Sequence, residues 1–230
     1  VLPNIDSYTT TACMMVSFRS LAPFDHAPSP RLDARALRPD SSAAGGHTGW
    51  VPFTVEELDR QLDHIAAAPC DAGTVELIVA RPAVGERDVL SIGELRPGVG
   101  LVGDNYLERG SRTTPDGSAD PLAELNIMSA RALASVAGPE RDRWPLAGDQ
   151  LIVDFDLSAA NAPAGTRMGI GTAVIEVTEK PHNGCAKFAD RFGIDAARWI
   201  NSRKDLRLRG ICAIVVEAGT VAVGDDIRLV

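Results

Sequence analysis

Cys185 and the residues around it have the clearest capacity for chemistry in this sequence. A turn rich in Pro, Asn and Gly precedes Cys185, and the pattern predicts a short helix that begins at the cysteine. A thiol at a helix N-terminus lies near the positive end of the helix dipole, which favours the thiolate. Lys187 and Arg191 add positive charge, and His182 is a candidate proton shuttle. Such a thiolate could attack an electrophile, carry a sulfur atom or bind a soft metal.

The same cysteine has a second interpretation. Cys185 shares its predicted helix face with Phe188 and Phe192, so it could instead be a small buried residue of the core. The other three cysteines are widely separated and form no CxxC pair, so neither a zinc knuckle nor a disulfide framework is expected. Cys212 lies within an apolar strand, which places it in the core.

Two further groups of residues could bind an anion. The glycine-rich stretch 98–103 is followed by Asp104, Asn105 and Arg112. Glycines allow a backbone to approach a ligand closely, and arginines pair with phosphate or carboxylate. The alternative is a tight turn with solvated arginines, because the Gly-Lys-Ser/Thr of a phosphate loop is absent. Arg209 precedes an apolar strand, where it could reach into a cleft or cap the end of a barrel.

Helical and β patterns alternate irregularly along the chain. Thr54 and Glu57 form the pattern of a capping box, which predicts a helix over 55–67. The sequence also predicts short strands at 73–81, 86–90, 124–128, 150–156, 172–178, 210–217 and 219–230, and helices at 130–137, 185–192 and 195–201. The last two strands are expected to form a hairpin through Ala218 and Gly219. This order argues against a doubly wound sheet and favours a mainly β protein with peripheral helices (α+β), built as a closed or nearly closed β-barrel.

Composition limits the class of protein. Lys and Arg number 23 and Asp and Glu 31 in 230 residues, and the net charge of −8 argues against a nucleic-acid partner. No apolar run approaches the ~20 residues that span a bilayer, and no signal peptide is apparent. We therefore expect a cytoplasmic protein without a membrane partner. Aromatic residues make up only 5 %, so the core must rest on Val, Ile, Leu and Ala.

The second half of the chain carries short motifs in a characteristic order. They are the turn Gly100-Leu-Val-Gly103-Asp104, the pairs Ala164-Gly165 and Ile170-Gly171, the loop to Cys185, and the closing Arg209-Gly210-Ile211 and Val223-Gly224-Asp225. In this order they resemble the MOSC domain, the module first seen at the C-terminus of molybdenum cofactor sulfurases. The resemblance covers roughly 98–230, which we interpret as a MOSC-like β-barrel domain. Residues 1–97 are then an N-terminal arm with a helix and strand extension packed on the barrel.

Three departures from the family pattern indicate a divergent branch. Ala147-Gly148-Asp149-Gln150-Leu151 replaces the stretch where the family often has Gly-Glu-Asn-Leu. The loop reads Pro181-His-Asn-Gly-Cys185 where Pro-Cys is common, and Asn105-Tyr106 replaces Arg-His after the Gly-Asp turn. The identity of a substrate therefore does not transfer.

The resemblance implies a barrel in which the Cys185 loop lines a pocket, in a family linked to molybdenum cofactor and sulfur handling. Some members reduce N-hydroxylated bases or amidoximes. On this basis Cys185 is the candidate metal ligand and catalytic thiol, with His182 as its acid or base. Candidate residues for binding a molybdopterin are Asp104, Asn105, Arg112, Lys187 and Arg209. No pyridoxal phosphate is expected, because nothing here resembles the separate domain that holds it in the sulfurases.

Two classes of function follow from the sequence. The first is an enzyme, a reductase or sulfur transferase that acts on a small molecule. The second is a non-catalytic module that carries sulfur on Cys185 and docks on a partner enzyme. Cysteine-dependent carbon–sulfur chemistry without molybdenum is a further alternative.

Overall fold

The computed structural model describes residues 51–230. The helices are α1 (Val55–Asp59), α2 (Leu62–Ala66), α3 (Tyr106–Arg109), α4 (Ala130–Ala137), the 3₁₀ helix η2 (Arg141–Ala147), α5 (Ala186–Phe192) and α6 (Ile194–Ile200). The strands are β1 (Ala72–Ala80), β2 (Asp88–Leu90), β3 (Ile92–Arg96), β4 (Gly100–Leu101), β5 (Leu125–Ser129), β6 (Leu151–Asp154), β7 (Arg167–Ile170), β8 (Ala173–Val177), β9 (Ile211–Glu217), β10 (Gly219–Ala222) and β11 (Asp226–Leu229).

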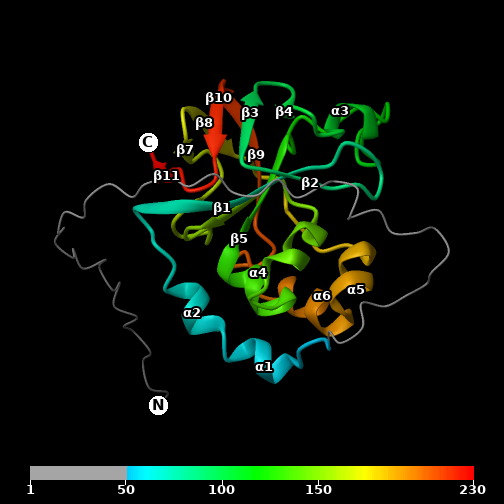
Figure 1. The fold of residues 1–230 in the computed structure, drawn as a ribbon, viewed down its shortest axis with the longest axis vertical. Coiled ribbons are helices and arrows are strands. Elements are labelled where there is room, and N and C mark those ends of the chain that lie inside the picture. Colours follow the sequence, from blue (N-terminus) through cyan, green and yellow to red (C-terminus); the bar gives the residue numbers. More distant parts are fainter. Residues whose placement is uncertain (1–50) are drawn as a thin grey trace, which may run out of the picture. The chain divides into compact units, whose positions relative to one another are not determined.

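Seven strands form a closed barrel in the order β11-β7-β8-β9-β5-β6-β1, and β1 returns to β11 to close the ring. Only β5 and β6 run parallel, and the other neighbours are antiparallel. The predicted mainly β barrel is therefore confirmed. Helices α1, α2, α4, α5 and α6 gather on one side of the barrel, while the small sheet β10-β3-β4 lies on the other (Figure 1). Within residues 51–230, no helix is long and apolar enough to cross a bilayer.

Strand β1 contributes to both hydrophobic cores, and a β-bulge changes which of its side chains face each core. Val75 and Ile78 lie in the core inside the barrel, whereas Leu77 and Val79 lie in the core beneath the helices. Side chains of a regular strand alternate, so Val75 and Ile78 could not share a face without an extra residue. The register with β6 shifts between Val75 and Leu77, which supplies that residue.

The barrel interior is aliphatic, as the scarcity of aromatic residues predicts. Phe155 is the only aromatic side chain among the buried residues of this core within the described part of the chain. The second core, between barrel and helices, holds more aromatic rings, those of Trp144, Phe188, Phe192 and Trp199. The aromatic residues therefore fix the helices to the barrel rather than fill the barrel itself.

Local signals placed several elements correctly. Thr54 and Glu57 form both hydrogen bonds of a capping box, with Thr54 N donating to Glu57 Oε2 at 2.8 Å and Glu57 N to Thr54 Oγ1 at 3.3 Å. Ser129 caps α4 by accepting from Ala132 N. The helix predicted over 55–67 is divided into α1 and α2.

Long-range pairing departs from the prediction in two places. The predicted hairpin between 210–217 and 219–230 is wrong, because β10 pairs with β3 and a separate strand, β11, pairs with β1 and β7. Strand β1 lies in the segment predicted as an extension, yet it supplies one of the seven barrel strands. The barrel therefore begins before Gly98.

Candidate functional site

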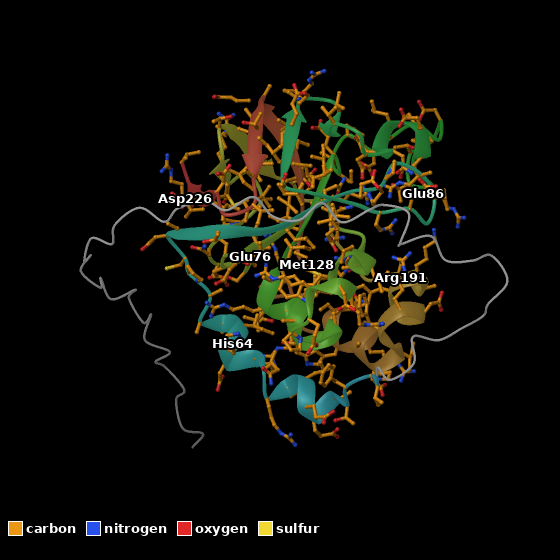
Figure 2. All side chains as sticks on the ribbon, viewed as in Figure 1. His64, Glu76, Glu86, Met128, Arg191 and Asp226 are labelled. Carbon is orange, nitrogen blue, oxygen red and sulfur yellow. The ribbon has the colours of Figure 1, made fainter. Side chains whose placement is uncertain are left out.

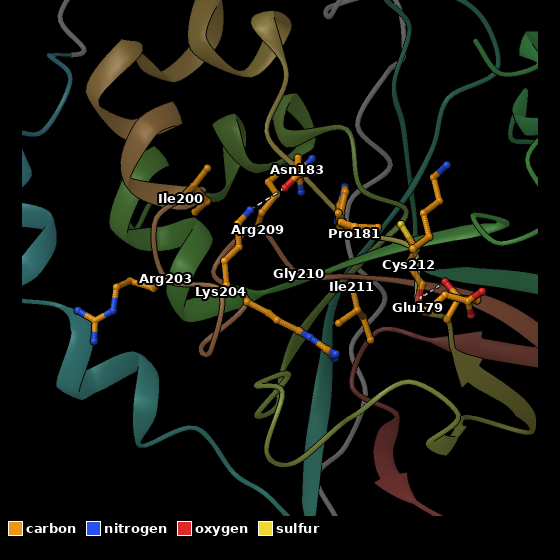
Figure 3. Close-up of a pocket in the computed structure, with 14 residues that line it drawn as sticks. Glu179, Pro181, Asn183, Ile200, Arg203, Lys204, Arg209, Gly210, Ile211 and Cys212 are labelled. Carbon is orange, nitrogen blue, oxygen red and sulfur yellow. Dashed lines mark hydrogen bonds between the residues drawn. The ribbon is translucent and has the colours of Figure 1, made fainter. Parts of the chain in front are cut away.

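A pocket of about 210 Å³ lies between the segment after β8, the end of α6 and the chain that enters β9 (Figure 3). Its lining contains five basic residues and one acidic residue, namely Lys180, Arg203, Lys204, Arg207, Arg209 and Glu179. Three of the five cations have a carboxylate partner outside the lining, Lys180 with Asp120, Arg203 with Asp205 and Arg209 with Asp149. The pocket is nevertheless predominantly basic in a chain whose net charge is −8. A concave site lined in this way favours an anionic ligand.

Arg209 and Asp149 form a buried ion pair at the inner side of this pocket. Arg209 Nη1 lies 2.7 Å from both carboxylate oxygens of Asp149, and the guanidinium packs on the Phe188 ring with 5.1 Å to its centroid. Burial raises the pKa of Asp149, and the charge of Arg209 opposes that rise. Arg209 Nε is buried without a hydrogen-bond acceptor. The Nε–H group of Arg209 is therefore available as a donor to a ligand. Leaving this buried group without an acceptor costs free energy.

His182 lies against the same carboxylate. Its Nε2 is 3.5 Å from Asp149 Oδ1, and the side chain is only 9 % exposed. A carboxylate neighbour would ordinarily raise the pKa of a histidine, but Arg209 contacts Asp149 more closely and offsets its charge. Burial, with Arg209 and Arg81, lowers the pKa of His182 well below 6.5, so the imidazole is neutral at pH 7. Its Nδ1 is buried without a partner.

A second buried pair joins the end of β1 to the turn after β4. Arg81 donates from Nε to Asp104 Oδ2 at 2.7 Å and from Nη2 to Asp104 Oδ1 at 2.8 Å. Both oxygens of the predicted ligand-binding residue Asp104 are thus occupied by an arginine. Asn105, next in the chain, has a buried Oδ1 without a hydrogen-bond donor.

The remaining predicted site residues lie on the surface. Cys185 is exposed at the N-cap of α5 and is not part of the pocket lining, although the lining residue Asn183 is two positions away. The alternative interpretation of Cys185 as a core residue is therefore wrong, even though Phe188 is buried. Lys187 and Arg112 are also exposed, and neither lines the pocket. The structure brings together His182 and Arg209, but not Cys185, Lys187 or Arg112 with them.

Cys212 is the thiol that lines the pocket (Figure 3). It is buried, as expected of a core residue, and its Sγ lies 3.5 Å from Asn126 Oδ1. Burial raises the pKa of Cys212 to about 11, so the thiol is protonated at neutral pH. Within residues 51–230 no three His, Cys, Asp or Glu side chains cluster in a way that could hold a metal ion.

Sequence reasoning missed Asp149 and Arg81 as members of this region. Asp149 had a signal, because it stands in the stretch that replaces the family's Gly-Glu-Asn-Leu. Arg81 had a weaker one, as a charged residue placed directly after an apolar strand and before Pro82. Their partners Arg209 and Asp104 were both selected as candidates, but the pairing depends on the barrel topology.

Comparison with known families matches residues 121–228 to the MOSC domain. This segment belongs to the MOSC domain family. The MOSC domain contains β5 to β11 and thus includes Asp149, His182, Cys185 and Arg209, whereas β1 lies outside the matched residues.

Solved structures with similarity to the chain include YuaD from Bacillus subtilis and YiiM from Escherichia coli. YuaD is 18 % identical with a TM-score of 0.49, and the alignment covers 69 % of this chain and 95 % of YuaD. YiiM is 21 % identical with a TM-score of 0.45, and the alignment covers 68 % of this chain and 69 % of YiiM. A comparison with curated proteins finds no significant match.

Proposed function

We propose that this MOSC domain binds the molybdenum cofactor, with the phosphate of the cofactor in the basic pocket. The observation that carries the proposal is the concentration of five basic side chains on a single pocket of an acidic chain. A phosphate requires charge and hydrogen-bond donors, and Lys204 and Arg209 supply both, whereas Lys180 is already paired with Asp120. The buried Nε of Arg209, which has no acceptor, would gain one from the ligand.

The residues fit the anionic part of the cofactor. In that complex Asp149 would hold the Arg209 guanidinium in place, and the neutral His182 would present Nδ1 or its proton to the ligand. When bound, the cofactor would supply a redox-active metal whose preference is for soft thiolate ligands. Cys185 is the accessible thiol near this pocket, since Asn183 two residues earlier lines it, whereas Cys212 is protonated.

The test is to purify the protein from a host that makes the cofactor and to measure molybdenum and released pterin. We expect both to be present in stoichiometric amounts. Lys204→Glu should reduce them at least tenfold, because it places a negative charge on the pocket lining. Arg198→Glu is the matched control, since Arg198 lies on α6, six residues before Lys204, is 74 % exposed and does not line the pocket. Native protein without molybdenum and pterin would contradict the proposal.

The exposure of Cys185 favours a second function, sulfur carriage. A Cys185 thiolate would attack the outer sulfur of a persulfide on a donor protein, forming a new S–S bond at Cys185. The donor cysteine would leave as a thiolate. An accessible thiol at a helix N-cap is suited to this exchange with a docked partner.

Mass spectrometry distinguishes the two functions. Sulfur carriage predicts a mass increase of one sulfur atom on the Cys185 peptide, removed by reductant and absent in Cys185→Ser. Cys70→Ser should retain it. Bound molybdenum without a persulfide would favour the cofactor function, and reduction of an N-hydroxylated base by that protein would identify it as an enzyme. Full activity in Cys185→Ser would exclude a role for this thiol.

A further inference from the structure

The C-terminal end of η2 is surrounded by arginines from three segments of the chain, the β1–β2 connection, α5 and the residues that precede β9. Four consecutive backbone carbonyls, residues 145–148, each accept a hydrogen bond from a different arginine. The bonds are Arg87 Nε to Pro145 O at 3.1 Å, Arg191 Nη1 to Leu146 O at 2.6 Å, Arg209 Nη2 to Ala147 O at 3.3 Å and Arg81 Nη1 to Gly148 O at 2.9 Å. Carbonyl groups at the end of a helix carry partial negative charge, so each contact is favourable.

These contacts leave the cluster with an excess of positive charge. Two of the four guanidinium groups have a carboxylate partner, Arg81 with Asp104 and Arg209 with Asp149. Within residues 51–230, no carboxylate lies within 4.0 Å of Arg87 or Arg191. The formal charge of the group is therefore at least +2, and a carbonyl dipole offsets only part of it.

Arg87 and Arg191 lie close to each other over Gly148. A Cβ atom on Gly148 would lie 3.4 Å from Arg87 Nη2 and 3.7 Å from Arg191 Nη1, so both nitrogens border the same point. Gly148 leaves that point empty and has the positive φ of +84° that favours glycine. Arg87 reaches this point from the β1–β2 connection and Arg191 reaches it from α5. Figure 2 shows Glu86, the residue before Arg87, on the same side of the molecule as Arg191.

Both guanidinium groups retain donor capacity. In the described part of the chain, Arg87 Nη2, which borders this point, donates to no protein group, and neither do the Nε and Nη2 atoms of Arg191, whose Nη1 donates to Leu146 O. Both side chains are partly exposed, so a ligand can approach them. Neither of them lines the basic pocket. Burial and the neighbouring charges of Arg191 and Arg81 lower the pKa of Arg87 to about 10.

We propose that Arg87 and Arg191 form a second anion site over Gly148, which binds a dianionic phosphate group. A phosphate there would accept from Arg87 Nη2 and from the unused donors of Arg191, and it would neutralise the excess charge. Simple capping of the end of η2 explains one hydrogen bond per arginine. It does not explain two neighbouring guanidinium groups without carboxylate partners that both lie within 4 Å of the Cβ position of one glycine. This site does not depend on the function proposed for the basic pocket.

The test is titration of the full chain, labelled with ¹⁵N-arginine, with inorganic phosphate at constant ionic strength. We expect the Nε–H resonances of Arg87 and Arg191, assigned from single substitutions, to shift in saturable fashion. Arg191→Gln and Arg87→Gln should each weaken this binding at least tenfold. Arg191→Lys, which keeps the charge and can keep the bond to Leu146 O, should retain part of it.

Two controls separate this site from other effects. Arg198→Gln, an exposed change on α6, should leave phosphate binding unchanged. Lys204→Glu should weaken binding at the basic pocket but leave the shifts of Arg87 and Arg191 intact, so failure at one site is distinct from failure at the other. Resonances of Arg87 and Arg191 that do not respond to phosphate, or that respond equally to chloride, would overturn the proposal.

Discussion

Two thiols near the candidate site, Cys185 and Cys212, have opposite environments. Cys185 is exposed at the start of α5, whereas Cys212 is 2 % exposed within β9 and its pKa is raised to about 11. A reaction that needs both access and a thiolate will therefore discriminate between them. The residue that sequence motifs select for chemistry and the residue that lines the pocket are different cysteines.

Alkylation should follow this difference. With iodoacetamide at pH 8, we expect Cys185 to react first, because about one Cys212 thiol in a thousand is ionised at that pH. Peptide mass spectrometry over time measures both rates in the same sample. Denatured protein, in which both cysteines should react at similar rates, is the control. Labelling of Cys212 as fast as Cys185 in the native protein would contradict the buried environment.

His182 should make stability depend on pH. Its pKa is lower in the folded protein than the ordinary 6.5, so the unfolded chain binds the proton first as the pH falls. The contribution of His182 to the free energy of unfolding is complete above pH 6.5. It decreases as the pH falls below 6.5, by up to about 1.4 kcal/mol per pH unit. The raised pKa of Asp149 acts in the opposite direction, since its folded form binds a proton more readily.

Urea denaturation at pH 7.5 and 5.5 measures this contribution. We expect His182→Gln to reduce the loss of unfolding free energy between the two pH values. His64→Gln, at an exposed position on α2, is the matched control and should leave the loss unchanged. An equal loss in native protein and His182→Gln would show that another group is responsible.

At the scale of the elements, strand β9 can pair with β5 only because the residue directly before β9 is a glycine. Gly210 precedes β9 with a φ of +95°, and a Cβ there would lie 1.9 Å from Ile127 O on β5. Backbone atoms cannot move that far without breaking the pairing of Ile127 with Ile211. The Arg-Gly-Ile motif therefore has a structural reason in addition to the role proposed for Arg209, which enters the candidate site from the same turn.

Gly210→Ala should destabilise the protein by more than about 3 kcal/mol, through both the clash and the strained backbone. Gly224→Ala is the control, because Gly224 has a similar φ of +93° but no atom within 4 Å of the added Cβ. It should cost only about 1 kcal/mol. Chemical denaturation measures both values. Equal costs would show that the close approach at β5 is not limiting.

The whole molecule depends on closure of the barrel by β1. This strand pairs with β6, with β11 and with β2, and it supplies side chains to both hydrophobic cores. A fragment without β1 would leave the edges of β6 and β11 open and their buried faces exposed. The matched MOSC segment, residues 121–228, is in this sense not a complete barrel.

Truncation tests this dependence. Residues 51–230 should fold and melt cooperatively, because they contain all seven barrel strands. Residues 98–230, the predicted MOSC-like domain, should give poorly dispersed NMR spectra and no cooperative thermal transition. A cooperative transition of 98–230 at a similar temperature would show that β1 is dispensable and that the predicted boundary is a true domain limit.

The sequence by itself determined the features that depend on near neighbours. The Thr54 cap, the Ser129 cap and most strand positions follow from patterns a few residues long. The closed barrel and the family follow from the order of short motifs, and the candidates His182 and Arg209 follow from those motifs without their common partner Asp149. These signals are short sequence patterns, so they can be recognised without knowledge of the fold.

Only the tertiary structure decided the contacts between distant residues. Arg209 and Asp149 are 60 positions apart, and Arg81 and Asp104 are 23 apart, so their pairing depends on which strands become neighbours. The same applies to β10, which pairs with β3 instead of forming the predicted hairpin. Strand pairing is set by burial of faces that many segments share, and no single pattern encodes it. For that reason only the folded chain shows the exposure of Cys185, the pocket position of Cys212 and the arginines around the C-terminal end of η2.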